Sequence, residues 1–358
     1  MSPKPGEAMR ARAPRRRSAG PTVDDVARIA GVSQMTVSRV VNRESNVHPA
    51  TREKVERAIA DLGYVPNPAA RSLAGGRQCR IALLYSNPSA AYLSEFLVGA
   101  LRAAAAYDAQ LVVEQWNGEE KTAGVARRLA AHRIDAALLP PPLSDDADLM
   151  KALRKAGLPI AQVATGKPLM QAHAVTIDDA AAAQTVTTHL IALGHRRIGF
   201  IAGNTNQTAS ALRQRGYEAA MREAGLEVDP ALIRPGDFSY RSGLEAAEAL
   251  LAQTPRPTAI FASNDDMAAA AVSVAHRRHL EVPEDLAVCG FDDTAMATTI
   301  WPELTTIRQP VAEMAEAALA LLAEAVRGNR ASEPPAPQHA RLPFALIVRG
   351  SSAPPHAD

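Results

Sequence analysis

The chain is poor in cysteine and in aromatic residues. Its 358 residues include two cysteines, Cys79 and Cys289, and only 4% aromatic residues. Two cysteines cannot build a disulfide framework, so we expect two reduced thiols, no metal site and no cofactor. No apolar run reaches the roughly 18 residues of a membrane span, and no apolar segment follows the basic N-terminus as in a secretion signal. We therefore expect a cytoplasmic protein.

The near-neutral total charge of +1 conceals two unlike regions. Residues 1–80 carry 15 Lys and Arg against 7 Asp and Glu, whereas the rest carries 24 against 31. The N-terminal region is thus +8 and the remainder −7. A basic region on an acidic body favours contact of that region with a polyanion such as DNA. A solvated basic tail is the alternative that charge alone leaves open.

The N-terminal region predicts a small helical domain. Thr22 followed three residues later by Asp25 is a capping-box pattern, and Gly31 and Gly63 are helix stop signals. Residues 1–20 show no periodicity and are expected to form a disordered basic arm. The pattern predicts a domain over residues 21–66, with helices over 23–30, 34–41 and 49–62.

A linker follows this domain. Pro66 disfavours helix at the residue before it, and Asn67-Pro68 then places a capping residue before a proline at the first helical position. The sequence predicts a short helix inside the linker 67–76. Such a short helix with a small apolar face is unstable alone, so we expect it to order only between paired subunits on DNA.

From residue 80 onward, short apolar strands alternate with amphipathic helices. Continuous apolar strands joined by helices indicate parallel sheets buried on both faces, here in two doubly wound lobes. The fold class is therefore α/β, with an all-α head. Strands are predicted over 81–85, 111–114, 136–139, 160–163, 198–202, 259–262, 288–291 and 342–348, and helices over 92–107, 179–193, 209–224, 242–253 and 267–279.

The first two helices and the glycine turn between them have the form of a helix-turn-helix motif. The second helix presents residues suited to base edges: Gln34 can pair with adenine, Arg39 with guanine, and the Met35 methyl can meet a thymine methyl. Its N-terminus can also receive a phosphate. Taken alone, the pattern also fits an ordinary three-helix bundle.

The segments TVDDVARIAGVSQMTVSRVVN and VHPATREKVERAIADLGYVPNPAARSL closely resemble the lac repressor (LacI) family of bacterial regulators, continuously over residues 22–76. The resemblance implies that Gln34, Met35 and Arg39 read bases, Thr36 and Ser38 hold the phosphate backbone, and Asn42 stabilises the helix end. It also implies a nucleoid-associated protein. The complete predicted DNA-binding set is Thr22, Ser33, Gln34, Met35, Thr36, Ser38, Arg39, Asn42, Asn67, Ala70, Arg71 and Leu73.

The segment NPAARSLA resembles the hinge helix of that family. The resemblance implies that two such helices pair in the minor groove, with Leu73 wedged between base steps and Ala70 near the groove floor. An apolar wedge unstacks one step and bends the duplex onto more protein surface. A buried linker residue is the alternative for Leu73.

The body, residues 80–349, resembles the periplasmic-binding-protein-like core of the same family. VTIDDAAAA, LIALGHRRIGFIAG, SALRQRGYEAA, PTAIFASNDDMA, VPEDLAVCGFDDT and PELTTIRQP carry the likeness. We expect lobe 1 over 80–177 and 295–322, lobe 2 over 178–294 and 323–349, and a loose tail over 350–358. The resemblance implies effector contacts from Asn87, Tyr92, Phe96, Asp178, Arg213, Phe238, Asn264 and Asp292.

These residue types suit a polyol. Asp and Asn read hydroxyls in both directions, Arg offers a fork of donors, and an aromatic face covers the apolar face of a sugar. Each also has a structural alternative. Arg213 could be a surface arginine, Asn264 only a helix cap, and Asp292 and Asp293 caps of the loop after a strand.

Two features of the body depart from the commoner family pattern. SNPSAAYLSEFLVG lacks the aromatic pair that often follows Asn-Pro, and Ala182 stands where many members have glycine. The sequences of these first-lobe segments, together with LLPPPLSDD, resemble those of a salicin-responsive subgroup. This resemblance implies a β-glucoside effector.

We therefore expect a repressor of carbohydrate-utilisation genes that binds a palindromic operator as a homodimer and is released by a sugar. Two other classes compete. An enzyme would need a metal spacing, nucleophile elbow or phosphate loop, none of which accompanies the histidines of the body. A sugar-binding transport protein would fit the body alone but not the helix-turn-helix head. Activation, or repression that requires the ligand, stays open.

Overall fold

A computed structural model describes residues 21–41, 47–64, 78–116, 118, 121–330 and 336–355. The chain divides into two compact units, Met1–Gln78 and Cys79–Asp358. Among the described residues, no helix combines the length and apolarity that a membrane crossing requires. The expected basic arm and hinge helix lie outside the described residues.

The first unit begins with a capped helix, α1 (Val23–Ala30). The Thr22 side chain accepts from the Asp25 amide while the Asp25 carboxylate accepts from the Thr22 amide, which forms the expected capping box. The helix ends at Gly31 in the left-handed conformation, φ 66°. That backbone geometry is strained for a residue with a Cβ, so glycine permits the tight turn into the next helix.

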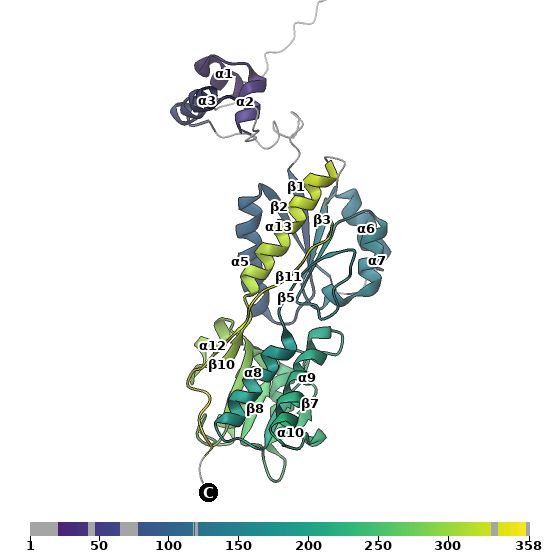
Figure 1. Ribbon diagram of the computed structural model, residues 1–358, viewed down its shortest axis with the longest axis vertical. Helices are drawn as coiled ribbons and strands as arrows, with labels where there is room; N and C mark the ends of the chain where they lie inside the picture. Colours follow the sequence, from purple (N-terminus) through teal and green to yellow (C-terminus); the bar gives the residue numbers. More distant parts are fainter. Residues whose placement is uncertain are drawn as a thin grey trace, which may run out of the picture. The chain divides into compact units, whose positions relative to one another are not determined.

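The helices α2 (Gln34–Val41) and α3 (Pro49–Leu62) complete the described part of this unit, at the predicted bounds. The Ser33 hydroxyl accepts from the Thr36 amide at 3.2 Å and caps α2. Val26, Val37 and Val55, one from each helix, are fully buried against one another. The predicted three-helix head is confirmed (Figure 1).

Lobe 1 of the second unit is built on a parallel sheet of six strands, in the order β11-β5-β4-β3-β1-β2. Every strand pair in it is parallel. The strands are β1 (Cys79–Tyr85), β2 (Ala109–Gln115), β3 (Ala136–Leu139), β4 (Ile160–Val163), β5 (His173–Thr176) and β11 (His339–Arg341).

Helices cover both faces of this sheet. Ile81 and Leu83 of β1 belong to the core beneath α5 (Ala90–Ala106) and α13 (Val311–Arg330). Ala82 and Leu84 point to the other face, beneath α6 (Thr122–Ala131) and α7 (Ala147–Lys155). A strand buried on both faces must be apolar throughout, which explains the continuous run in β1.

Lobe 2 repeats the plan with the strand order β12-β10-β9-β8-β6-β7, in which only the β10–β12 pair is antiparallel. Helices α8 and α9 pack together, as do α10 and α11, and the two pairs belong to different core clusters (Figure 1). The elements are β6 (Ile198–Ile201), β7 (Ile233–Arg234), β8 (Ala259–Ala262), β9 (Ala287–Asp292), β10 (Thr305–Arg308), β12 (Ala345–Ile347), α8 (Asp179–Ala192), α9 (Thr208–Glu223), α10 (Tyr240–Leu251), α11 (Asp265–Arg277) and α12 (Ala295–Thr299).

The expected division of the lobes needs correction after residue 294. Strand β10 pairs with β9 in lobe 2, so residues 295–308 do not belong to lobe 1. Helix α13 packs on α5 and β11 pairs with β5, so 311–330 and 339–341 belong to lobe 1, and the boundary expected at 322 is wrong. The chain therefore crosses between lobes three times, after β5, after β10 and after β11.

The tail is not loose up to residue 355. Ser351 is fully buried; its carbonyl accepts from the Val288 amide at 2.7 Å, and its hydroxyl accepts from the Thr305 amide at 2.8 Å. His195 bonds the Ala353 carbonyl through Nε2 and the Thr258 hydroxyl through Nδ1, at 2.9 and 3.0 Å. The prediction failed because these partners are remote in sequence. His195 thus holds the tail in place.

This anchoring predicts a pH-dependent loss of stability. Burial lowers the pKa of His195, whereas an imidazole in the unfolded chain titrates near pH 6.5. Its contribution to stability is therefore present above about pH 6.5 and is lost as the pH falls through the lower folded pKa. We expect the melting temperature of His195→Gln to fall less between pH 7.5 and 5 than that of the unchanged protein.

Differential scanning fluorimetry across this pH range measures the two slopes. His132→Gln, a substitution at an exposed position in lobe 1, controls for the change of side chain. Equal slopes for His195→Gln and the unchanged protein would show that this imidazole does not titrate on unfolding.

Candidate functional site

The outer face of α2 carries the side chains predicted to read DNA. Gln34, Met35 and Arg39 are exposed, Met35 with 65% of its surface accessible, while Val37 and Val40 face the core. Arg39 lies one helical turn beyond Met35, with its Nη2 3.7 Å from the Met35 sulfur. An exposed methionine beside an arginine leaves an apolar contact and a fork of donors on one helix face, as base readout requires.

The other predicted DNA contacts divide into two groups. Thr36 and Ser38 are half-buried beside this face, and Ser33 and Thr22 serve as helix caps, so their hydroxyls already have partners within the head. Contact of these residues with DNA stays a prediction. The remaining five, Asn42, Asn67, Ala70, Arg71 and Leu73, lie outside the described residues.

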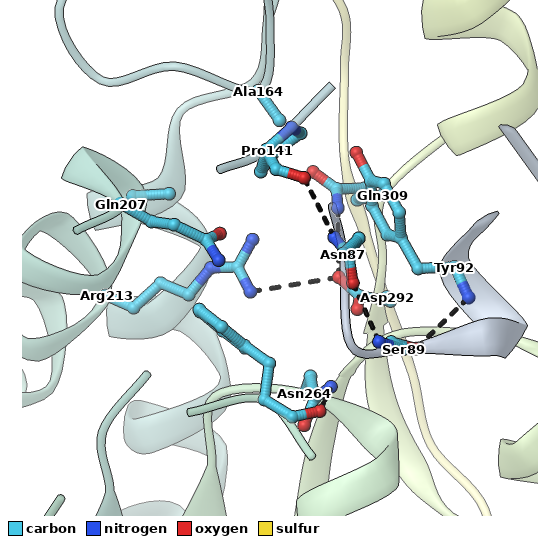
Figure 2. Close-up of a pocket in the computed structure, with 12 residues that line it drawn as sticks. Asn87, Ser89, Tyr92, Pro141, Ala164, Gln207, Arg213, Asn264, Asp292 and Gln309 are labelled. Carbon is cyan, nitrogen blue, oxygen red and sulfur yellow. Dashed lines mark hydrogen bonds and ion pairs between the residues drawn. The ribbon is translucent and has the colours of Figure 1, made fainter. Parts of the chain in front are cut away.

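A cavity lies between the two lobes of the second unit, at the carboxyl ends of both sheets (Figure 2). Ligands of doubly wound folds bind at this edge. Its volume is about 20 Å³, enough for about one water molecule. The lining residues are Asn87, Ser89, Tyr92, Pro141, Ala164, Gln207, Ala209, Arg213, Phe238, Asn264, Asp292 and Gln309.

Arg213 of α9 is the buried centre of this cavity. Its Nε donates to the Asp179 carboxylate at 2.9 Å and its Nη1 to the Ser263 carbonyl at 2.6 Å. The guanidinium also lies 3.6 Å from the centre of the Phe291 ring. With only 4% of its surface exposed, Arg213 is not the surface arginine that the sequence left as an alternative.

Asp292, at the end of β9, faces Arg213 from the other side. The two side chains approach to 3.8 Å between Nη1 and Oδ1, and Figure 2 shows the guanidinium pointing toward this carboxylate. Gln309 donates to the same Oδ1 at 2.9 Å. Burial raises the pKa of Asp292 well above its ordinary range, and Arg213 opposes that rise.

The neighbouring Asp293 has a different task. It forms ion pairs with Arg308 at 2.7 Å and with Arg349 at 2.6 Å, and it does not line the cavity. In the GFDD segment, Asp293 therefore stabilises the loop, which is the structural role that the sequence left open, whereas Asp292 faces the cavity.

Asn264 and Phe238 form one unit at the cavity wall. Asn264 caps α11 by accepting from the Met267 amide at 3.0 Å, and it donates to the Phe238 carbonyl at 2.9 Å. Phe238 has a φ of 72°, and its ring fills the space that a Cβ on Gly203 would occupy. Asn264 is therefore a helix cap that also lines the cavity, and its contact with an effector stays a prediction.

The first lobe contributes Asn87, Ser89 and Tyr92. Asn87 donates to the Pro141 carbonyl at 3.2 Å and accepts from the Ser89 amide at 2.8 Å, which fixes the loop after β1 (Figure 2). The Ser89 hydroxyl donates to Asp266 of lobe 2, so this loop also joins the lobes.

Two predicted contacts are not brought to the cavity. Phe96 is fully buried one helical turn beyond Tyr92, in the core beneath α5, because that face of the helix packs on the sheet. Asp178 caps α8 and pairs with Arg341 at 3.0 Å. Neither lines the cavity.

Six lining residues were not predicted: Ser89, Pro141, Ala164, Gln207, Ala209 and Gln309. Pro141 and Ala164 follow β3 and β4, whose ends could have indicated them, since ligands bind at strand carboxyl ends. Gln309 follows β10, a strand that was not predicted, and its signal was its place in the PELTTIRQP segment of family likeness.

Two side chains of the cavity have polar atoms without a partner. The Tyr92 hydroxyl and the Gln309 carbonyl oxygen are buried and make no hydrogen bond with the part of the chain that the structure describes. A buried polar group without a partner costs about 1–3 kcal/mol, so a hydroxyl-rich ligand would find both a donor and an acceptor here. The described residues contain no group of three or more side chains suited to hold a metal ion.

Comparison with known proteins agrees with this architecture. Residues 22–67 match the pattern of "Bacterial regulatory proteins, lacI family", and residues 187–352 match that of "Periplasmic binding protein-like domain". The HTH-type transcriptional regulator CelR of Thermobifida fusca is 37% identical over 318 residues, 86% of this chain and 93% of CelR. The chain belongs to the lacI family of bacterial regulatory proteins.

Two solved structures have the same fold. A complex of the transcriptional regulator CelR with cellobiose superposes with a TM-score of 0.71 at 34% identity, covering 92% of this chain and 99% of CelR. A lac repressor dimer bound to operator and the anti-inducer ONPF gives 0.71 at 30%, covering 93% and 99%. The protein is a DNA-binding transcriptional regulator, and these relatives are regulators rather than enzymes.

The buried charges predict a specific response to mutation. Arg213→Met leaves the Asp179 and Asp292 carboxylates buried without their cation, so we expect a loss of about 3–5 kcal/mol in the free energy of unfolding. The double variant Asp179→Asn/Arg213→Met removes one carboxylate charge as well and should recover part of that loss. Urea denaturation measures both.

Arg215→Met, at an exposed position of the same helix, is the matched control and should change stability little. An Arg213→Met variant as stable as this control would contradict the role of the buried charge cluster in stability.

Proposed function

We propose that the protein is a transcriptional repressor of carbohydrate-utilisation genes. It binds a palindromic operator as a homodimer through the exposed face of α2 and the predicted hinge helix. A small neutral sugar enters the cavity between the lobes and releases the operator. The regulatory class follows from the family, and the particular residue roles are part of the proposal.

The DNA half of the proposal is supported by the exposed face of α2. Gln34, Met35 and Arg39 lie on the exposed side of a helix whose opposite side is buried, as a helix that enters the major groove requires, and the Gln34 amide donates to Asp24 within the head. The similar lac repressor structure is a dimer bound to operator. A two-fold dimer places one head on each half-site, and a palindromic operator follows.

The effector half is carried by the unpartnered polar atoms beside the Arg213–Asp292 pair. Tyr92 and Gln309 offer a donor and an acceptor, while Arg213 offers further N–H donors and Asp292 an acceptor. Phe238 adds a ring 5.9 Å from the guanidinium. Donors and acceptors around one aromatic ring suit the hydroxyls and the apolar face of a sugar.

A β-glucoside is the finer proposal for the effector. The similar CelR structure is a complex with cellobiose, whose two glucose units are joined by a β-linkage. The first-lobe likeness to a salicin-responsive subgroup points to the same class of ligand.

The switch requires the lobes to separate. A cavity of about 20 Å³ cannot admit a sugar, since small-molecule sites typically measure about 300–1,000 Å³. The Ser89–Asp266 contact joins the two lobes in this conformation. A ligand that binds one lobe arrangement more tightly than the other shifts the protein toward that arrangement. The ratio of the ligand's affinities for the two arrangements limits how far operator affinity can change.

Base readout by Arg39 predicts a change in operator preference. Arg39→Ala should weaken binding to the preferred operator by about 1–3 kcal/mol and relax the choice of base at one position. Operator selection from a random library, followed by titration of single-base variants, measures this. Arg57→Ala removes an arginine from α3 that pairs with Glu53 and should leave base preference unchanged. Uniform weakening on every sequence by Arg39→Ala would contradict base readout.

The cavity predicts a separation of sensing from DNA binding. Asp292→Asn keeps the shape of the side chain but removes its charge, so we expect at least tenfold weaker sugar binding, about 1.4 kcal/mol, with operator affinity retained. Asp293→Asn is the matched control at the adjacent residue, outside the cavity. Isothermal titration with cellobiose and glucose, with operator binding in parallel, measures both. Unchanged sugar affinity in Asp292→Asn would remove this residue from the site.

A further inference from the structure

A second and larger cavity adjoins the one described above. Its volume is about 410 Å³, and Ser86, Trp116, Pro142, Asp145, Asp146 and Asn206 are among its lining residues. That volume lies in the range of small-molecule sites. None of these residues was predicted from the sequence to take part in binding.

The two cavities share the same loops. Ser86, Pro142 and Asn206 line the larger cavity, and their chain neighbours Asn87, Pro141 and Gln207 line the smaller one. Consecutive side chains of the loops after β1, β3 and β6 therefore face the two spaces in turn. A ligand that extends past these loops from the inner cavity enters the outer one.

Trp116 forms an apolar wall of the outer cavity. It follows β2 directly, and its amide donates to the Tyr85 carbonyl at 2.9 Å, which fixes its position beside β1. Only 8% of its surface is exposed, and its indole N–H is buried without a partner. A tryptophan with a rigid backbone and an unused donor can pack its face on the apolar side of a ring and donate its N–H to a hydroxyl group of that ring.

The polar residues of the outer cavity select against anions. Asp145 and Asp146 are carboxylates, Ser86 and Asn206 are neutral, and no Lys or Arg is found among the described residues that line it. A phosphate or a carboxylate placed here would meet like charge without a cation, which is unfavourable. The donors of a neutral polyol can instead bond the carboxylate oxygens.

Asp145 also closes the lobes. Its carboxylate accepts from the Thr165 hydroxyl of lobe 1 at 2.6 Å and from the Thr208 amide of lobe 2 at 2.7 Å. The Thr208 hydroxyl in turn accepts from the Gly166 amide at 2.6 Å. A ligand in the outer cavity thus lies against the hydrogen bonds that join the lobes.

We propose that the outer cavity is the subsite for the second ring of a neutral disaccharide whose first ring occupies the inner cavity. The inference rests on the proposed function and adds the size and charge of the effector. A one-ring sugar fills only the inner cavity and does not reach the Asp145 contacts. The protein then responds to a disaccharide and only weakly to its monosaccharide.

The test is isothermal titration of the full-length protein with cellobiose and with glucose. We expect cellobiose to bind at least tenfold more tightly than glucose. Trp116→Ala should remove that preference while glucose affinity changes less than twofold. Asn206→Ala, at an exposed position that does not affect the core, should reduce the same preference. Trp301→Phe, at the other tryptophan, which is 83% exposed and outside both cavities, should keep it.

The chain contains only two tryptophans, so the Trp301→Phe variant also reports on Trp116 alone. Its emission should shift on addition of cellobiose and stay constant with glucose at equal saturation. Equal affinity for the two sugars, or a preference that both Trp116→Ala and Asn206→Ala retain, overturns the subsite while leaving the sugar sensor intact. If neither sugar binds, the sugar-sensing function itself is contradicted, and the subsite with it.

Discussion

The burial of one positive charge constrains the second unit more than any other interaction. Arg213 is 4% exposed, and its cation is held by Asp179, the Ser263 carbonyl and the face of Phe291. Asp179 comes from α8, Ser263 from the loop after β8, and Phe291 from β9. The charge is therefore satisfied only when three separate segments are in place. A buried ion without such partners would cost several kcal/mol.

The same cluster prepares the cavity chemically. Burial raises the pKa of both Asp179 and Asp292, and Arg213 opposes the rise in each case. A ligand hydroxyl that enters here meets donors and acceptors that are already oriented and shielded from water. Because these donors and acceptors are oriented before a ligand binds, less entropy is lost on association. A small number of side chains can therefore define the site.

Much of the fold could be predicted because it depends on local patterns. The capping box at Thr22, the stop at Gly63 and the apolar runs of β1 and β9 are visible within a few residues. Strands β7 and β11 were missed because they have only two and three residues. Strand β10 was missed because it begins with two buried threonines rather than an apolar run, and β5 because it begins with a histidine and ends with a threonine.

The site was predictable to a different degree in each lobe. Arg213, Phe238, Asn264 and Asp292 lie in segments with a clear family likeness, and all four line the cavity. Gln309 lies in the PELTTIRQP segment and Trp116 follows a predicted strand, but their place at the cavities depends on pairings between distant strands. The lobe boundary failed for the same reason: α13 and β11 return to a sheet whose other strands end at residue 176.

The three crossings between the lobes bear on how the chain is made. The first lobe lacks its covering helix α13 and its edge strand β11 until residues 311–341 have been synthesised. On the ribosome, the apolar face of its sheet that holds Ile81 and Leu83 is covered by α5 but not by α13 while most of the second lobe emerges. Domains usually fold in order as they leave the ribosome. Here the DNA-binding head can fold early, whereas neither lobe is complete until its last strand, β11 or β12, has been synthesised.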